Sequence, residues 1–180
     1  MQEVSRARST DKRRNLNCAE PIGKERIQRK KLNPHYVAGF IDGEGSFSVS
    51  IGKHKTLKRR MEIRPEFEIE LRADDREILE RILITIGCGR IYDLSYERYG
   101  WYPHVKYKIG GRKDMVKYLF PFLDRYPLQA KKLKDYKSFK KIVLSMEKKE
   151  HLSDKGYQKI VSIRDEMRKN GKKAKSFGNR

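Results

Sequence analysis

The chain has 180 residues, and its 44 Lys and Arg against 24 Asp and Glu give a formal net charge of +20. The length favours one domain that can bury a core without disulfides. So large a positive charge predicts a polyanionic partner, with an inert basic surface as the plainer alternative. No apolar run approaches the roughly 18 residues of a membrane span, and no signal peptide is evident. We therefore expect a soluble, intracellular protein with no membrane partner.

The two cysteines, Cys18 and Cys88, stand in no zinc-type spacing and near no histidine cluster. We expect both to be free thiols, with Cys88 packed and Cys18 exposed. Residues 1–32 hold ten Lys and Arg, and we expect a basic N-terminal arm that is irregular or orders on binding; a solvated tail is the alternative. A single domain over 33–169 and a basic C-terminal tail over 170–180 complete the predicted organisation.

The first half of the predicted domain changes its period at Gly45. A short helix is expected over 34–41, with Asn33 as its N-cap and Pro34 at its first position. From Gly45 onward apolar residues alternate with serines, which indicates a strand. A longer strand is expected over 61–71, with apolar residues on one face and glutamates and arginines on the other.

The second half of the predicted domain repeats the order of helix and strands. Asp74 opens an amphipathic helix that ends at Gly87 and Gly89. Two strands follow, joined by a turn around Gly100, and then three helices, the last of them capped by Ser153. The ranges expected for these elements are 90–94 and 102–109 for the strands, and 112–123, 127–146 and 154–169 for the helices.

Strand pairs separated by a helix predict an α+β domain, in which helices cover one face of an antiparallel sheet. The opposite face carries Ser, Glu, Arg, His and Lys side chains and must meet water or a ligand. In a chain of charge +20, this polar face is a natural platform for nucleic acid.

The segment 37–45 contains glycines and acidic residues that are unfavourable in a helix. Gly39 and Gly43 each weaken a helix by roughly 1 kcal/mol relative to alanine, and close approach of a second helix would explain them. Asp42 and Glu44 stand at a helix C-terminus, where negative charge is unfavourable unless a cation is bound. The simpler alternative is a helix end with turn glycines and exposed acids.

Val37-Ala38-Gly39-Phe40-Ile41-Asp42-Gly43-Glu44-Gly45 resembles the LAGLIDADG motif of the homing endonuclease family. The order of elements downstream, the stretch Ile86–Ile91 and the stretch Tyr126–Lys132 also follow that family, so the resemblance covers about 33–146. It implies the LAGLIDADG fold, α-β-β-α-β-β-α, whose twisted antiparallel sheet forms a DNA-binding saddle. It also implies a site-specific homing endonuclease that makes a double-strand break in a long, roughly palindromic DNA site.

The resemblance assigns roles at the end of the motif. Glu44 matches the catalytic acid that binds the metal, and the carbonyl of Gly43 matches a second metal ligand. Hard oxygen ligands suit Mg²⁺, and Mn²⁺ or Ca²⁺ would fit the same site. Lys132 best matches a basic residue that lies near the active site in relatives; a solvated lysine is the alternative reading of Lys132.

The motif occurs once in this sequence, and family members with one motif pair two copies. A homodimer with double-stranded DNA as partner is therefore implied, its twofold axis running between the two motif helices. The predicted dimer interface consists of Val37, Ala38, Gly39, Ile41 and Asp42.

Residues on the polar sheet face are the candidates for DNA binding, because Arg and Lys can contact guanine and Glu can accept from cytosine. A cross-strand charge ladder is the alternative use of the glutamates. Some relatives place a Gln and an Arg near the metal, where this sequence has Leu71 and Asp75, so those roles are not carried over, although Arg72 or Arg76 could substitute. The predicted DNA-binding residues are Ser48, Ser50, Arg64, Glu66, Glu68, Glu70, Arg72, Arg90, Tyr92, Lys106 and Lys108.

Four other functions compete with cleavage by this site. An RNA splicing maturase, with intron RNA as partner, or a DNA-binding protein that has lost cleavage would share the fold, but Glu44 argues against lost activity. A GIY-YIG nuclease is disfavoured because its name motif is incomplete around 90–92. An HNH site is disfavoured because the four histidines are scattered, at His35, His54, His104 and His151.

Overall fold

The computed structural model describes residues 30–56 and 61–175, with side chains up to residue 169. The predictions for Cys18, for the arm before residue 30 and for the end of the C-terminal tail lie outside these residues. The Cys88 thiol is buried, as expected, and its Sγ lies 3.9 Å from Asp114 O. Within the described ranges, no helix combines the length and apolar character needed to cross a membrane.

The described chain alternates helices and strands in the predicted order. Its elements are α1 (Pro34–Glu44), β1 (Ser46–Lys53), β2 (Met61–Arg72), η1 (Ala73–Asp75), α2 (Arg76–Ile86), β3 (Arg90–Leu94), η2 (Glu97–Tyr99), β4 (His104–Ile109), α3 (Arg112–Asp114), η3 (Met115–Leu119), α4 (Phe120–Arg125), α5 (Lys132–Glu147), η4 (Glu150–Leu152) and α6 (Asp154–Lys175). The α+β prediction is confirmed.

The four strands form one antiparallel sheet in the order β1-β2-β4-β3. Phe47 lies opposite Phe67 in the register of β1 and β2, and Phe67 lies opposite Ile109 in that of β2 and β4. Because side chains alternate between the faces of a strand, these pairings put the odd-numbered apolar residues on one face of the sheet. The even-numbered polar residues share the other face.

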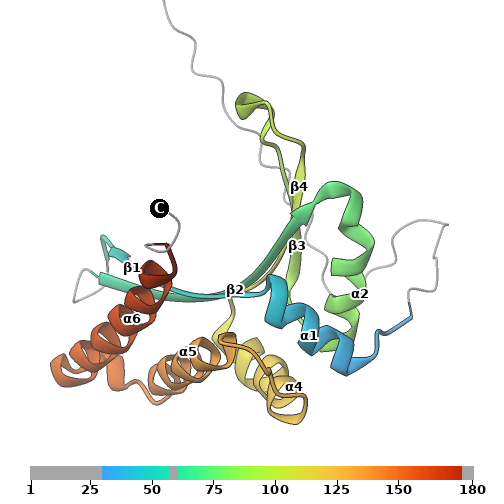
Figure 1. The fold of residues 1–180 in the computed structure, drawn as a ribbon. Helices are drawn as coiled ribbons and strands as arrows, with labels where there is room; N and C mark the ends of the chain where they lie inside the picture. Colours follow the sequence, from blue (N-terminus) through green and yellow to red (C-terminus); the bar gives the residue numbers. More distant parts are fainter. Residues whose placement is uncertain (1–29, 57–60, 176–180) are drawn as a thin grey trace, which may run out of the picture.

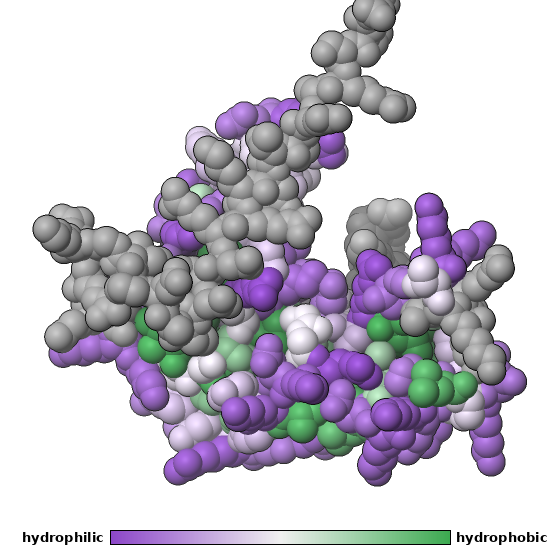
Figure 2. Space-filling view, turned by 180° about the vertical axis from the view of Figure 1, so that it is seen from behind, coloured by the Kyte–Doolittle hydropathy of each residue, from purple (hydrophilic) through white to green (hydrophobic). Residues whose placement is uncertain are grey.

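The sheet is curved, and helices α1, α2, α4 and α5 lie on its convex side (Figure 1). None of these four helices lies on the concave side, and the β3–β4 hairpin rises above the rest of the sheet at one end. The surface seen from behind is largely hydrophilic, with hydrophobic residues in patches between the charged ones (Figure 2).

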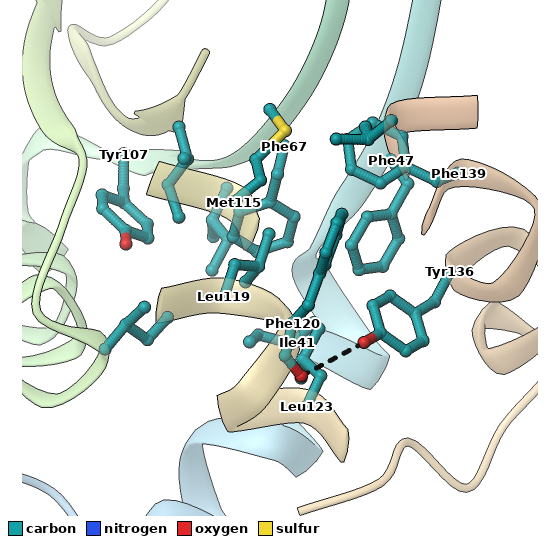
Figure 3. Packing of buried hydrophobic residues seen from close by; sticks show 14 of the residues in the cluster. Ile41, Phe47, Phe67, Tyr107, Met115, Leu119, Phe120, Leu123, Tyr136 and Phe139 are labelled. Atoms are coloured by element: carbon teal, nitrogen blue, oxygen red, sulfur yellow. Dashed lines mark hydrogen bonds between the residues drawn. The ribbon is translucent and has the colours of Figure 1, made fainter. Parts of the chain in front are cut away.

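The core fills the space between the convex sheet face and the helices. Phe47 packs against Phe67 and Phe139 with ring centroids 5.0 and 5.3 Å apart, and α4 contributes Phe120 and Leu123 to the same cluster (Figure 3). Burying one such side chain contributes about 1.5–3 kcal/mol to folding. Ile41 of the motif helix also belongs to this cluster, so the core fixes the position of α1.

Two helix boundaries differ from the sequence predictions. α5 begins at Lys132 rather than at Pro127, because the amide groups of Gln129 and Ala130 donate to a side chain of α1. α6 continues to Lys175 instead of ending near 169. Its predicted cap is confirmed, since Gly156 N donates to Ser153 Oγ at 3.1 Å.

The helix expected over 112–123 contains a π-helical turn, η3, between α3 and α4. In that turn Phe120 N–H donates to Met115 O, five residues earlier. Pro121 follows immediately and has no N–H to donate, so the widened turn lets the helix continue past it.

Candidate active site and nucleic-acid interface

The motif helix α1 is held at both ends by its own sequence. Asn33 Oδ1 accepts a hydrogen bond from His35 N at 2.9 Å, and Pro34 occupies the first helical turn. At the other end, Gly45 N donates to Ile41 O at 2.9 Å, and a Cβ at position 45 would lie only 2.7 Å from that oxygen. Only glycine therefore fits where α1 passes directly into β1.

Glu44 and the Gly43 carbonyl form the end of α1. Both residues are exposed, and no ion pair engages Glu44 within the described ranges. Lys132, the first residue of α5, donates from Nζ to Gly43 O at 2.9 Å. This contact satisfies a terminal carbonyl of the helix and places a cation at the negative end of its dipole.

Burial lowers the pKa of the Lys132 ammonium, while the carboxylates of Asp42 and Glu44 act in the opposite direction. Lys132 thus lies near Asp42 and Glu44, which precede it by 90 and 88 positions, at the junction of α1 and α5. The sequence prediction that Lys132 lies near Glu44 agrees with this placement. Its catalytic role remains a proposal.

Asp42 points into the chain and holds the segment before α5. Its Oδ2 atom accepts from Gln129 N at 2.6 Å and from Ala130 N at 3.1 Å. Its Oδ1 atom is buried and has no hydrogen-bond partner among the residues that the structure describes. Since Lys132 follows this segment directly, Asp42 fixes the start of the helix that carries Lys132, a role that sequence reasoning missed.

The two sides of α1 have opposite environments. Val37, Ala38 and Ile41 are buried in the chain's own core, at 0%, 5% and 0% exposure. Their predicted place in a dimer interface stays a prediction, and within one chain these side chains are already covered. Gly39 and Gly43 lie on the open side, where an added Cβ would meet nothing within 4 Å.

The predicted DNA-binding residues all lie on the polar, concave face of the sheet. Cross-strand register places Glu68 opposite Lys108 and Glu70 opposite Lys106. On the flanking strands, Ser48 and Ser50 lie opposite Glu66 and Arg64, and Arg90 and Tyr92 lie opposite Lys108 and Lys106. The alternation seen in the sequence has brought these side chains onto one surface.

The glutamates of β2 pair with the lysines of β4. Lys108 Nζ lies 2.7 Å from Glu66, and Lys106 Nζ lies 2.9 Å from Glu70 and 3.3 Å from Glu68. Burial raises the pKa of Glu70, but hydrogen bonds from Lys106 and Tyr96 outweigh it and lower the pKa overall. Of the two uses considered for the glutamates, the charge ladder is the one formed within the chain.

The arginines proposed to substitute near the metal are engaged elsewhere. Arg72 pairs with Asp74 at 2.8 Å, and Arg76 pairs with Glu80 at 2.8 Å and also with Asp93. These contacts leave neither guanidinium beside Glu44. On the concave face, Arg64 pairs with Glu62 at 2.5 Å, whereas Arg90 has no ion pair among the described residues.

Comparison with known proteins identifies the family to which this site belongs. The LAGLIDADG endonuclease family model matches residues 37–143, more than half of the chain. The chain belongs to the LAGLIDADG endonuclease family. A probable intron-encoded endonuclease of Neurospora crassa is 29% identical over 133 residues, which are 74% of this chain but only 27% of the relative. The chain therefore spans about a quarter of that relative's length.

Solved LAGLIDADG structures share the fold. The homing endonuclease I-TnaI superposes with a TM-score of 0.70 at 33% identity, over 77% of this chain and 89% of the other. I-SmaMI, bound to an uncleaved DNA target in the presence of calcium ions, superposes with a TM-score of 0.71 at 35% identity, over 77% of this chain and 46% of the other. These matches confirm the predicted LAGLIDADG fold.

The donor set at the LAGLIDADG motif suits a hard divalent cation. Glu44 offers an exposed carboxylate and Gly43 a carbonyl oxygen, both at the negative end of α1. Mg²⁺ is commonly bound by one or two carboxylates, with water and substrate phosphate completing its ligands. No cluster of three His, Cys, Asp or Glu side chains suited to a metal occurs in the described ranges, so a metal here would need ligands from substrate or a second chain.

Sequence reasoning also missed an aromatic cluster at the end of the β3–β4 hairpin. Tyr96, Tyr99, Trp101 and Tyr102 lie between the two strands, and Tyr96 OH donates to Glu70 Oε1 at 2.8 Å. The density of aromatic residues over 96–102 was the available signal. A turn of this kind more often carries small polar residues.

Proposed function

We propose that this chain is a site-specific homing endonuclease that makes a metal-dependent double-strand break in a long, roughly palindromic DNA site as a homodimer. One observation carries the proposal: Glu44, Gly43 O and Lys132 Nζ meet at the end of the family motif, with 2.9 Å between the last two atoms. Glu44 is separated by one residue from β1, whose even-numbered side chains belong to the concave polar face.

The proposed chemistry is hydrolysis of a phosphodiester. Mg²⁺, held by Glu44 and the Gly43 carbonyl, would activate water and offset charge on the phosphate oxygens. Lys132 would contribute a positive charge at the same place, and Asp42 would hold the start of α5 so that Lys132 stays there. Glu44 is exposed, so its carboxylate is accessible to a substrate on the concave face.

A homodimer is supported by the open side of α1. Gly39 and Gly43 are exposed and have free space where a side chain would stand, although glycine destabilises a helix. Tyr36 and Phe40 stack on the same helix with ring centroids 6.1 Å apart, and Tyr36 is 50% exposed. Pairing of two such helices would bring two copies of Glu44 together, one for each DNA strand.

Duplex DNA would lie on the concave face. The side chains of the Lys106 and Lys108 ion pairs keep 22–31% of their surface exposed, so a phosphate or a base edge can reach them and take the place of a glutamate partner. Arg90 needs no such exchange, and Ser48, Ser50, Arg64, Arg72 and Tyr92 share the surface. The glutamates keep the lysines in place and can accept from cytosine amino groups.

Cleavage of a randomised duplex library tests the proposal. Incubation in Mg²⁺, followed by sequencing of the cut ends, should give one long, roughly palindromic consensus cut on both strands. The same duplexes should be bound without being cut in EDTA. Enrichment of bound but uncut duplexes in Mg²⁺ would contradict the assigned activity and leave a DNA-binding protein.

A further inference from the structure

The β3–β4 hairpin ends in an exposed aromatic cluster, formed by Tyr96, Tyr99, Trp101 and Tyr102. Tyr99, Trp101 and Tyr102 are 55%, 64% and 69% exposed, and they are three of the seven large hydrophobic side chains exposed in the described part of the chain. Exposed apolar groups gathered in one place commonly mark a binding surface. The catalytic proposal above makes no use of them.

The rings are held in place by one another and by arginines. Trp101 lies 6.0 Å from Tyr96 and 5.9 Å from Tyr99, measured between ring centroids. The Arg98 guanidinium lies 4.5 Å from the centre of the Tyr99 ring, and Arg72 lies 4.5 Å from that of Tyr102. A cluster arranged in this way before binding loses little conformational entropy when a ligand meets it.

The cluster continues the concave face of the sheet. Tyr96 OH donates to Glu70, which belongs to the charge ladder, and Arg72 lies on β2 beside the same row of residues. The hairpin rises above the sheet (Figure 1), so a duplex on the concave face would meet the cluster at its outer end. The major groove of B-DNA is wide enough for a two-stranded β-ribbon, and the flanking arginines favour DNA over an apolar protein partner.

The apolar surface of the rings matches one apolar group in the major groove. Trp101 and the tyrosine rings present mainly apolar surface, and the C5-methyl group of thymine is the apolar group that base edges display there. We propose that the cluster recognises thymine methyl groups at the outer end of each half-site, with Trp101 and Tyr102 as the contacting side chains. This inference rests on the proposed function, because it requires duplex DNA on the concave face.

Uracil in place of thymine tests the inference, since uracil lacks only the methyl group. Duplexes are first selected from a randomised library in Ca²⁺, and each outer thymine of the consensus is then replaced by uracil. One buried methyl group corresponds to a loss of about fourfold in affinity. We expect such a loss for the wild-type chain at one or more outer positions, and none for Trp101→Ala. Leu144→Ala, which shortens an exposed side chain of α5, should behave like wild type.

Equal affinity of the wild-type chain for thymine and uracil duplexes would overturn the inference. So would a Trp101→Ala variant that weakens both duplexes by the same factor, which would indicate a contact with the backbone alone. An unchanged affinity of Trp101→Ala for the thymine duplex would also overturn the inference, because Trp101 would then contribute nothing to DNA binding. In each of these cases the chain would still select and cut DNA; if it selects no duplex at all, the proposed function and this inference fail together.

Discussion

Substitution of Gly39 separates the stability of one chain from that of the proposed dimer. A Cβ at this position meets nothing within 4 Å, so a leucine side chain fits the isolated chain without a clash. Replacing a helical glycine by leucine should stabilise the chain by about 0.5–1 kcal/mol. The same side chain would stand between two closely packed helices and should abolish the dimer.

The two effects have opposite signs and can be measured together. Light scattering at micromolar concentration should give a dimer for the wild-type chain and a monomer for Gly39→Leu. The midpoint of thermal unfolding should rise with concentration for wild type only. Gly52→Leu, on β1 and equally free of neighbours within 4 Å, should leave the dimer intact. A Gly39→Leu variant that remains dimeric would refute the placement of the interface on this side of α1.

Three further predictions follow from contacts in the structure. Asp42→Ala should lower the free energy of unfolding in urea by about 1.5–3 kcal/mol, since Oδ2 accepts two backbone N–H groups, and Asp42→Asn should cost less; equal costs would contradict the role of its charge. Lys132→Met should slow single-turnover cleavage roughly 100-fold, whereas Lys131→Met should not. Lys106 and Tyr96 hold the pKa of Glu70 below its usual 4.5. The ionised Glu70 side chain should therefore stabilise the folded chain at neutral pH, and this contribution should be lost as the pH falls through the lowered pKa. Glu70→Gln should therefore be less stable than wild type at pH 7 and equally stable near pH 2.

Local patterns predicted the elements of this fold well. The alternation of Phe47, Val49 and Ile51 with serines was enough to assign the faces of β1, because side-chain direction in a strand follows from position alone. Asn33 and Pro34 likewise marked the start of α1, since helix caps depend on neighbouring residues. The same alternation along the strands predicted the polar face and the eleven residues proposed to contact DNA.

Contacts between distant segments were the part that local patterns could not supply. Asp42 binds amide groups 87 and 88 positions away, and this contact delays the start of α5. The predicted assignment of Val37, Ala38 and Ile41 to a dimer interface meets the same limit, because these side chains are buried within one chain. An apolar stripe along a helix shows that one side is buried, but the chain's own core competes with a partner for it.

The most direct test of the account is the separation of binding from cleavage by Glu44→Gln. The substitution keeps the size of the side chain and removes its charge, and Glu44 has no ion pair within the described ranges that the change would break. Gel shifts in Ca²⁺ and cleavage in Mg²⁺ are compared on one selected DNA fragment. We expect binding equal to or tighter than wild type, and cleavage slower by orders of magnitude. Cleavage at a rate close to wild type would contradict the assignment of Glu44 as the catalytic acid.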